Sequence, residues 1–191
     1  MSSSNAPRLA RPLARAALAL ALAGLTAGCF QPLYGSGGGG PTAGASSIGD
    51  KLGSVEVIPI VAPAATPLAR LAVAVRNDLI FDLTGGGPTG VSAYKLKVDL
   101  STSTRQVIVD INSARPEIQN YGINATYTLT DNATGKTLFT SYTFSRVSYN
   151  IPGQLQRFAG ERGLRDAENR AAKEIAGNIR NRLASYFVAG T

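Results

Sequence analysis

The stretch of sequence that decides the fold is residues 94–101, YKLKVDLS, in which every second side chain is apolar. The apolar side chains from Tyr94 to Leu100 fall on one face of an extended chain, and the charged and hydroxyl side chains between them fall on the other. Strict alternation of this kind indicates a strand with one buried face and one open face. The sequence therefore predicts a sheet that packs against a core on one side.

Alternating segments continue beyond this stretch. The phase of the alternation changes between Thr102 and Gln106, where a bulge or bend would carry the strand on to Ile111. Residues 113–116 read as a turn and residues 131–135 as a hairpin turn, and each is followed by another strand with one apolar face. We expect the buried faces of these strands to be Ile123, Ala125, Tyr127 and Leu129 in the first, and Leu138, Thr140, Tyr142 and Phe144 in the second.

Two other segments have apolar side chains at helical spacing. One follows a short strand at residues 55–60 and begins at Thr66-Pro67, an N-cap residue followed by a proline in the first turn. The other runs from about Leu155 to Phe187. The order is strand, helix, three strands, helix, so we expect an α+β fold in which two helices pack on one face of a four-stranded mixed or antiparallel sheet. The apolar stripe of the second helix is Leu164, Ala167, Ala171, Ile175, Ile179, Leu183 and Phe187.

The first 28 residues have the parts of a bacterial lipoprotein signal peptide. Residues 1–15 are polar and carry arginines without any acid, and residues 16–27 form an apolar run that is too short to span a bilayer. The LTAGC sequence at residues 25–29 fits the lipobox, whose cysteine sulfur receives a diacylglycerol before the chain is cut. We therefore expect residues 1–28 to be removed and Cys29 to anchor the chain in a membrane. The alternative is a buried free cysteine that happens to follow an apolar stretch.

A flexible tether is expected between this anchor and the folded part. We expect residues 29–52 to form this tether, because residues 36–50 are rich in glycine and serine. A flexible coil of about 24 residues has a root-mean-square span of about 27 Å. The folded domain, expected at residues 53–188, would therefore stay close to the membrane surface.

The composition excludes several classes of function. The chain has no histidine and one cysteine, which rules out Ser-His-Asp and Cys-His catalysis and an intrachain disulfide, and leaves a zinc site with carboxylates alone. The net charge of +7 includes three arginines that precede Cys29, so the part from Cys29 onward carries sixteen basic against twelve acidic residues. This mild excess does not indicate a nucleic-acid-binding protein. We expect no cofactor and no metal.

The AGCFQPLYG segment at residues 27–35 resembles the start of the mature chain in the LPS-assembly lipoprotein family, LptE, in its alphaproteobacterial form. The SYNI run at residues 148–151 and the order of elements over residues 53–187 are also similar to that family. The resemblance implies a non-enzymatic, LptE-like α/β sandwich domain that partners the outer-membrane β-barrel LptD. It implies that the domain plugs this barrel, helps it to fold and helps to deliver lipopolysaccharide to the outer leaflet. Phe30, where an aspartate would favour inner-membrane retention, agrees with an outer-membrane location on the periplasmic side.

Lipopolysaccharide carries phosphates and carboxylates, so a site for it needs lysine or arginine side chains with free donors. Five cations lie on or beside the predicted strands, and two of them are preferred because they lie at turns. The alternative is that these charges only solubilise the sheet or keep its edges from pairing. The candidates are Lys95, Lys97 and Arg105 on a strand, and the preferred Arg115 and Lys136 at turns.

Hydroxyl side chains on the predicted strands would suit contact with the polar lumen of a barrel, or they form an ordinary solvated face. They are Ser101, Thr102, Ser103, Thr104, Thr126, Thr128 and Thr130. Tyr121, Tyr142 and Tyr149 are candidate interface anchors, although Tyr142 is also expected in the core.

Two other functions compete with LPS assembly. The chain could be the auxiliary lipoprotein of a lipid-trafficking ABC transporter, which would bind an inner-membrane component instead. It could also be a periplasmic lipoprotein enzyme such as a hydrolase, but the absence of histidine and of a compact pair of acids argues against catalysis.

Overall fold

The computed structural model describes residues 48–87, 90–109, 116–151 and 157–189. Its elements are α2 (Ile48–Gly53), β1 (Val55–Val57), α3 (Pro67–Thr84), β2 (Tyr94–Val109), β3 (Pro116–Asp131), β4 (Thr137–Asn150) and α4 (Arg157–Ala189). The expected signal peptide, Cys29, most of the expected tether, Arg115 and most of the expected turn at residues 113–116 lie outside the described residues. None of the described helices combines the length and the hydropathy of a membrane-spanning segment.

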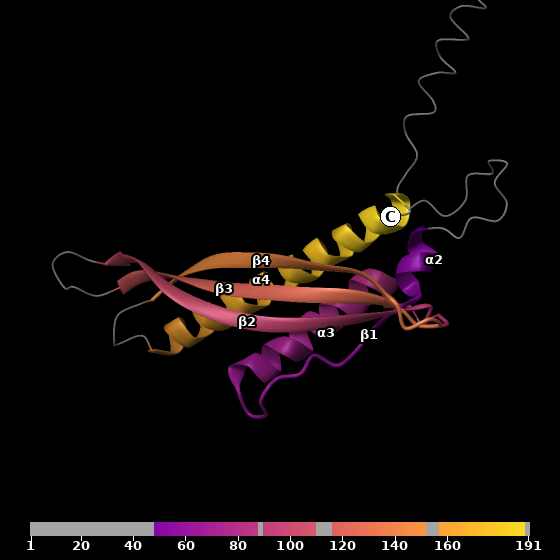
Figure 1. Ribbon diagram of the computed structural model, residues 1–191. Coiled ribbons are helices and arrows are strands. Elements are labelled where there is room, and N and C mark those ends of the chain that lie inside the picture. The colour runs from indigo at the N-terminus through magenta and orange to yellow at the C-terminus, as the bar shows by residue number, and fades with distance from the viewer. Residues whose placement is uncertain (1–47, 88–89, 110–115, 152–156, 190–191) are drawn as a thin grey trace, which may run out of the picture. The chain divides into compact units, whose positions relative to one another are not determined.

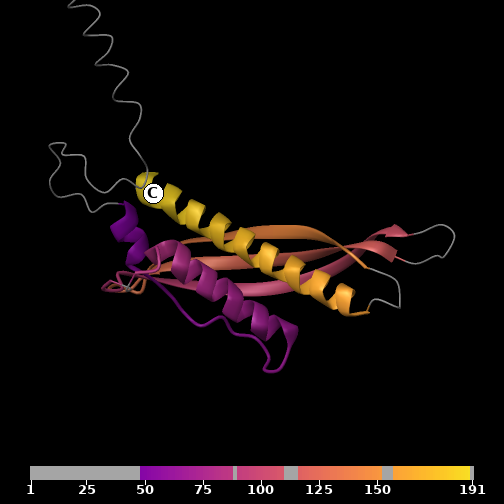
Figure 2. The same cartoon turned by 180° about the vertical axis from the view of Figure 1, so that it is seen from behind.

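The four strands form one mixed sheet in the order β1-β2-β3-β4. β1 runs parallel to β2, and β2, β3 and β4 are antiparallel neighbours. α3 and α4 both lie on one side of this sheet, which Figure 1 shows from the strand side and Figure 2 from the helix side. The expected α+β fold, with two helices on one face of a four-stranded sheet, is confirmed.

The boundaries of α3 follow from its terminal residues. The Thr66 hydroxyl accepts a hydrogen bond from the Ala69 N–H at 3.2 Å, and Pro67 occupies the first turn, where no N–H is needed. The helix ends at Gly85, whose φ of 66° places it in the left-handed region and whose N–H donates to the Phe81 carbonyl. The N-cap that the sequence predicts is therefore confirmed.

The core lies between the sheet and the two helices. Its largest fully buried side chains come from β2 and β3, from α3, and from the predicted stripe of α4. α4 presents alanines beside its larger apolar side chains, which lets its backbone approach the sheet closely. Burial of each leucine or isoleucine side chain contributes about 1.5–3 kcal/mol. The fully buried side chains include Leu79, Leu96, Ile123, Leu129, Ile175, Ile179 and Leu183.

The buried face of β4 is the opposite of the predicted one. Tyr142 is 73 % exposed and Phe144 47 % exposed, whereas Ser145 and Val147 are buried. The pairing with β3 decides this, because Tyr142 lies opposite Thr126, and Thr126 faces away from the helices. The prediction that Thr140, Tyr142 and Phe144 face the core was therefore wrong, whereas Leu138 is partly buried and packs against the core as expected.

Hydrogen bonds to α4 compensate for the polar inner face of β4. The buried Ser145 hydroxyl donates to the Glu174 carboxylate at 2.6 Å. Asn178 donates through its side-chain N–H to the Thr143 hydroxyl at 3.3 Å. Because these hydroxyls have partners, they can lie under the helix without the cost of an unsatisfied polar group.

The change of phase in β2 has a different cause from the expected bulge at residues 102–106. β2 and β3 stay in register from Tyr94 to Gln106, and the register shifts between Gln106 and Ile108 and again between Ile108 and Val109. From Ser101 to Val107 the β2 side chains are exposed on both faces of the strand. The apolar alternation therefore stops where β2 leaves the core, and the shifts of register lie further along the strand.

The residues that precede β1 also differ from expectation. The expected tether ended at residue 52, but Ile48–Gly53 form the short helix α2. Leu52 is buried in the core, and the Ser54 N–H donates to the Asp50 carbonyl at 3.0 Å. The folded part therefore begins a few residues earlier than the glycine and serine content indicated. β1 is likewise shorter than expected, at three residues.

Candidate functional site

The side of the sheet that faces away from α3 and α4 is not covered by any described element (Figure 1), and we call it the open face. The strand register arranges its side chains in rows across β2, β3 and β4. The open face consists of Lys95, Lys97, Asp99, Ser101, Ser103 and Arg105 on β2, Asn120, Gly122, Asn124, Thr126, Thr128 and Thr130 on β3, and Thr140, Tyr142, Phe144, Arg146 and Ser148 on β4.

We call the part of the open face beside the hairpin turn at residues 131–136 the near end. Lys95 lies opposite Thr130 and Lys97 opposite Thr128, both with exposed side chains. The Lys97 ammonium lies 3.3 Å from the Asp99 carboxylate in an exposed pair, so this contact contributes about 1 kcal/mol at most. Lys136 is exposed in the adjoining turn.

The hairpin turn at the near end is held by Asp131. Its carboxylate accepts hydrogen bonds from the Thr134 N–H at 2.8 Å and from the Thr134 hydroxyl at 2.9 Å. These bonds favour the ionised form and lower the pKa of Asp131 below its ordinary value. The turn that presents Lys136 is therefore fixed by its own side chains.

The part of the open face around Tyr142 and Phe144 has a different chemistry, and we call it the middle band. It carries two exposed aromatic rings among small hydroxyl and amide side chains. The Thr128 and Thr140 hydroxyls, on neighbouring strands, are hydrogen-bonded at 3.1 Å. The middle band consists of Ser101, Asn124, Thr126, Thr128, Thr140, Tyr142 and Phe144.

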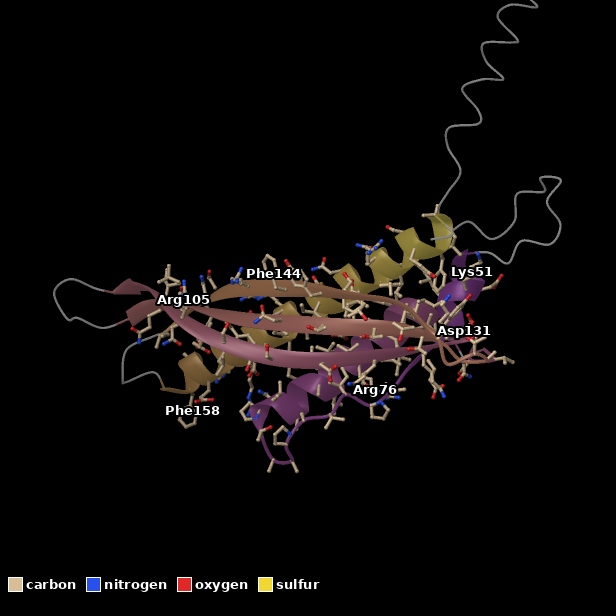
Figure 3. All side chains as sticks on the ribbon, in the orientation of Figure 1. Lys51, Arg76, Arg105, Asp131, Phe144 and Phe158 are labelled. Carbon is tan, nitrogen blue, oxygen red and sulfur yellow. The ribbon has the colours of Figure 1, made fainter. Side chains whose placement is uncertain are left out.

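Arginines mark the opposite end of the open face, which we call the distal end. The Arg146 guanidinium lies over the Phe144 ring, with its carbon 4.6 Å from the ring centroid. Arg105 lies two strands away and one row further along, which places the two backbone positions about 12 Å apart. Figure 3 labels Arg105 and Phe144 on this side of the sheet. Two side chains of this length can reach one anionic group from such positions.

Gly122 makes room at the distal end for a hydroxyl group of the neighbouring strand β2. A Cβ atom at this position would lie 2.7 Å from the Ser103 hydroxyl oxygen and 3.8 Å from the Arg146 Cγ. The absence of a side chain therefore leaves room for the Ser103 hydroxyl over β3, whereas the stem of Arg146 would meet a Cβ atom at an ordinary van der Waals distance. In the next row, the Ser148 hydroxyl donates to the side-chain amide oxygen (Oδ1) of Asn120 at 2.6 Å.

The structure brings together only part of the predicted lipopolysaccharide site. Lys95, Lys97 and Arg105 share the open face, but about 27 Å of strand separates Lys97 from Arg105. Lys136 joins the lysines at the near end, and Arg115 lies outside the described residues. Reasoning from sequence missed Arg146, because the wrong face was assigned to β4. The signal that could have found it is the spacing of Phe144 and Arg146, which places both on one face of a strand.

Two of the three predicted tyrosine anchors lie on the covered side. Tyr121 is buried in the core, and its burial, with a further contribution from the Glu168 carboxylate, raises the pKa of its hydroxyl. Tyr149 is partly buried and donates its hydroxyl to the Gln119 side chain at 2.6 Å. Only Tyr142 has the exposure that an interface anchor needs.

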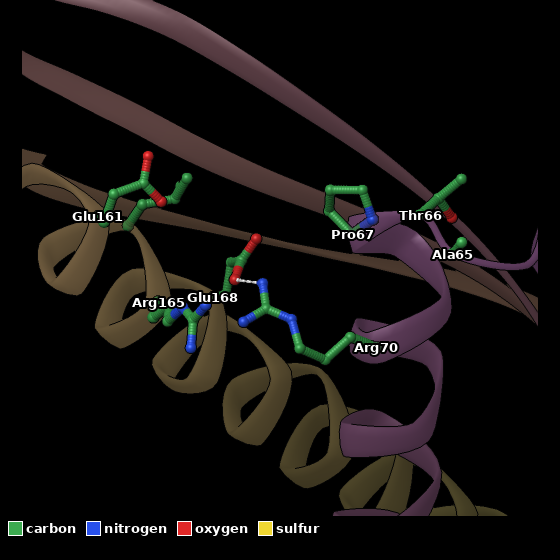
Figure 4. A pocket seen from close by; sticks show the side chains of 8 residues that line it. Ala65, Thr66, Pro67, Arg70, Glu161, Arg165 and Glu168 are labelled. Atoms are coloured by element: carbon green, nitrogen blue, oxygen red, sulfur yellow. Dashed lines mark hydrogen bonds and ion pairs between the residues drawn. The ribbon is translucent and has the colours of Figure 1, made fainter.

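A pocket of about 390 Å³ lies on the covered side between the start of α3 and the first turns of α4 (Figure 4). Glu168 is 4 % exposed and forms an ion pair with Arg70, which joins the two helices. Arg165 and Glu161 also line the pocket, so its positive and negative side chains balance. The ion pair between Arg70 and Glu168 therefore explains the charged side chains of this pocket as a structural contact between α3 and α4.

Comparison with known proteins identifies a family whose model matches this chain and solved structures that resemble it. The model of the LptE family, described as lipopolysaccharide-assembly, matches residues 52–183. A putative lipoprotein from Caulobacter crescentus has a similar structure, with a TM-score of 0.59 and 21 % identity, covering 76 % of this chain and 98 % of its own. The rare lipoprotein B from Shewanella oneidensis gives a TM-score of 0.51 and 14 % identity, covering 71 % of this chain and 96 % of its own. No curated protein matches the chain.

Proposed function

The chain belongs to the LptE lipopolysaccharide-assembly family, and on that premise we propose that it partners an LptD-like outer-membrane β-barrel, as a plug and folding partner, and contacts lipopolysaccharide directly. The family consists of non-enzymatic, outer-membrane lipoproteins with a role in lipopolysaccharide transport. The non-enzymatic role agrees with the absence of histidine from the sequence.

The proposal includes a lipid anchor on the periplasmic face of the outer membrane. The anchor is Cys29, at the end of the apolar run and the small residues of the lipobox. Two or three acyl chains on one residue suffice for stable attachment to a bilayer. We expect Cys29→Ala to leave an unprocessed or mislocalised precursor, measured by membrane fractionation and intact mass. Normal processing and normal membrane attachment of this variant would rule out the anchor.

The single observation that carries the proposed lipopolysaccharide contact is the charge of the open face. Its described residues include one acid, Asp99, which already pairs with Lys97. They also include four cations, which are Lys95, Lys97, Arg105 and Arg146. At the distal end, the Phe144 ring holds the Arg146 guanidinium in place, so its fork of donors is oriented before a ligand arrives. Guanidinium groups bind phosphate oxygens through two parallel hydrogen bonds. Arg105 and Arg146 are therefore the cations we favour for a lipid A or inner-core phosphate, with Lys95, Lys97 and Lys136 as a second group.

The middle band supports the proposed barrel contact. The interior of an outer-membrane barrel is polar, and a plug inside it needs a polar surface that can exchange hydrogen bonds with the wall. Threonine, serine and asparagine side chains of the open face both donate and accept such bonds.

A pull-down of the lipid-anchored protein after extraction in mild detergent tests the partnership. We expect mass spectrometry to identify one large outer-membrane barrel. Recovery of an inner-membrane permease instead would favour the ABC transporter hypothesis and overturn this proposal, as would the absence of any barrel.

The lipopolysaccharide contact needs its own test. Arg146→Ala should weaken retention of lipopolysaccharide by the purified protein by about tenfold, because a charge-assisted bidentate contact is lost. Lys173→Ala removes one exposed positive charge from α4 and is the matched control. Equal retention by the two variants would contradict a role for the distal end.

A further inference from the structure

We infer that the outer edge of β4 is an interface at which two copies of this chain pair. In this twofold dimer the two β4 strands run antiparallel, with the axis at Phe144, and the two α4 helices lie side by side. The inference goes beyond the proposed function and does not depend on it. The surface concerned is the border of the sheet, and the open face stays uncovered.

The backbone of β4 faces outward at every second residue. β4 is the last strand of the sheet, so no described strand pairs with its outer side. The Leu96 carbonyl accepts a hydrogen bond from the Ile58 N–H, so the even-numbered residues of β2 turn their backbone groups away from β3. The register carried through β3 then assigns the even-numbered residues of β4 to its outer side. The outward residues are Thr140, Tyr142, Phe144, Arg146 and Ser148.

A side chain of α4 reaches one end of this edge, which supports the assignment. Arg170 donates through its side-chain N–H to the Ser148 carbonyl at 3.3 Å. From Thr140 to Arg146 the outward backbone groups face no described strand. A row of donors and acceptors at strand spacing is a template for a further strand.

β4 lacks the features that usually keep an exposed edge from pairing. Natural edge strands are blunted by proline, by lysine, by bulges or by short length. β4 has fourteen residues without proline, glycine, lysine or acid, and its register against β3 is unbroken from Phe139 to Asn150. The part of the β2 edge beyond β1, in contrast, carries Lys97, Asp99 and Arg105. Of the two edges, β4 is therefore the one suited to pairing.

The sequence of β4 is complementary to itself about Phe144. Two antiparallel strands that pair through their edges place outward residues opposite outward residues. An axis at Phe144 brings its two copies together and sets Tyr142 opposite Arg146 of the second copy, on both sides of the axis. Aromatic pairs and cation–π contacts between facing residues stabilise such a ladder. An axis at Arg146 would instead bring two guanidinium groups together.

α4 lies beside β4 at the level of this axis (Figure 2). The Ser145 hydroxyl donates to Glu174, and the Asn178 side chain donates to the Thr143 hydroxyl. These two contacts flank Phe144 on the strand. A strand pair centred there therefore brings residues 174–178 of both α4 helices to the same level.

The side of α4 that looks past β4 carries short side chains. They are Gly177, Asn181 and Ser185, at a spacing of four, and we call them the short row. The short row lies one row further round the helix than Glu174 and Asn178, which contact β4. A Cβ atom on Gly177 would meet nothing within 4 Å, so packing inside one chain does not require glycine there. Glycine weakens a helix interior, and its presence agrees with a close approach by a second helix.

A second copy of this chain fits these features better than a strand of another protein. An unrelated strand would satisfy the edge of β4 alone. A second copy satisfies this edge and also covers the short row with the same row of its own α4. The edge and the short row lie on different elements, and both point to one twofold contact.

Disulfide trapping tests the position of the axis. In the dimer, Phe144→Cys places its two Cα atoms about 5.5 Å apart, within the range of a disulfide. Thr140→Cys is the matched control on the same edge, because its two copies would lie about 27 Å apart. Both variants are made in the lipid-anchored full chain, purified and reconstituted in vesicles of phosphatidylethanolamine and phosphatidylglycerol. We expect mild oxidation to give about tenfold or more disulfide-linked dimer from Phe144→Cys than from Thr140→Cys. Equal yields would show random collision and overturn the inference.

Sedimentation equilibrium of the full chain in detergent measures the dimer itself. Tyr142→Pro removes the ring and an outward N–H that β3 does not use, whereas Tyr142→Val removes the ring alone. Gly177→Arg puts a long side chain into the short row, and Asn77→Arg puts the same side chain on the exposed side of α3. We expect the first variant of each pair to weaken dimerisation by about tenfold relative to the second.

Unchanged thermal unfolding shows that these variants are folded. A wild-type chain that stays monomeric at every concentration, or equal dissociation constants within both pairs, would overturn the inference. Recovery of the barrel is a separate measurement, so the proposed function stands or fails independently of this result.

Discussion

The two faces of one sheet differ in almost every physical respect. On the covered face, β2 and β3 present leucine, isoleucine, valine and alanine to α3 and α4, and these side chains are almost completely buried. On the open face, the same strands present threonine, serine, asparagine and cations, and no described element covers them. Alternate residues of the same strands therefore serve stability on one face and recognition on the other. Substitutions on neighbouring residues should therefore have unrelated effects.

The largest effect should come from a cavity in the covered face. Leu129→Ala removes a fully buried side chain of β3 and should lower the free energy of unfolding by about 2–5 kcal/mol, because the lost burial and the cavity add. Thr126→Val, on the open face of the same strand, should change it by less than about 0.5 kcal/mol. Urea denaturation measures both. Similar losses in the two variants would break the distinction between the faces.

A smaller effect is expected at the junction of β4 with α4. Ser145→Ala removes the buried hydroxyl that donates to Glu174, and should cost about 1 kcal/mol. Ser101→Ala, which removes an exposed hydroxyl on β2, is the matched control and should cost less. If thermal unfolding showed the control to be the more destabilised variant, the hydrogen bond would not be what holds this side of α4.

The smallest effect should appear only at alkaline pH. Burial raises the pKa of Tyr121 above 10.0, so the unfolded chain releases this proton at a lower pH than the folded chain does. Stability from this group is complete below pH 10 and is lost as the pH rises through the folded pKa. Tyr121→Phe should therefore lose less stability than wild type between pH 8 and pH 10.5 in urea titrations. A loss as large as that of wild type would show that Tyr121 does not contribute.

Part of the candidate site could be predicted from the sequence. The alternation from Tyr94 to Leu100 is so regular that it fixes which side chains face the core, and it placed Lys95 and Lys97 on the open face correctly. The same reasoning failed for β4, because both of its faces carry aromatic and hydroxyl side chains. Phe139 and Val147 lie on one face, and Tyr142 and Phe144 lie on the other. Hydrophobic alternation alone cannot separate two faces that are this similar.

The amino-acid sequence by itself determined the order of the elements from β1 to α4, the N-cap of α3, the apolar stripe of α4 and the core faces of β2 and β3. These features depend on contacts within a few residues and on a strong difference between apolar and polar positions. The tertiary structure alone decided which side of β4 is buried, because the register against β3 and the hydrogen-bond partners on α4 select it. It also decided that Arg146 lies over Phe144 beside Gly122, because the distal end is assembled from three strands.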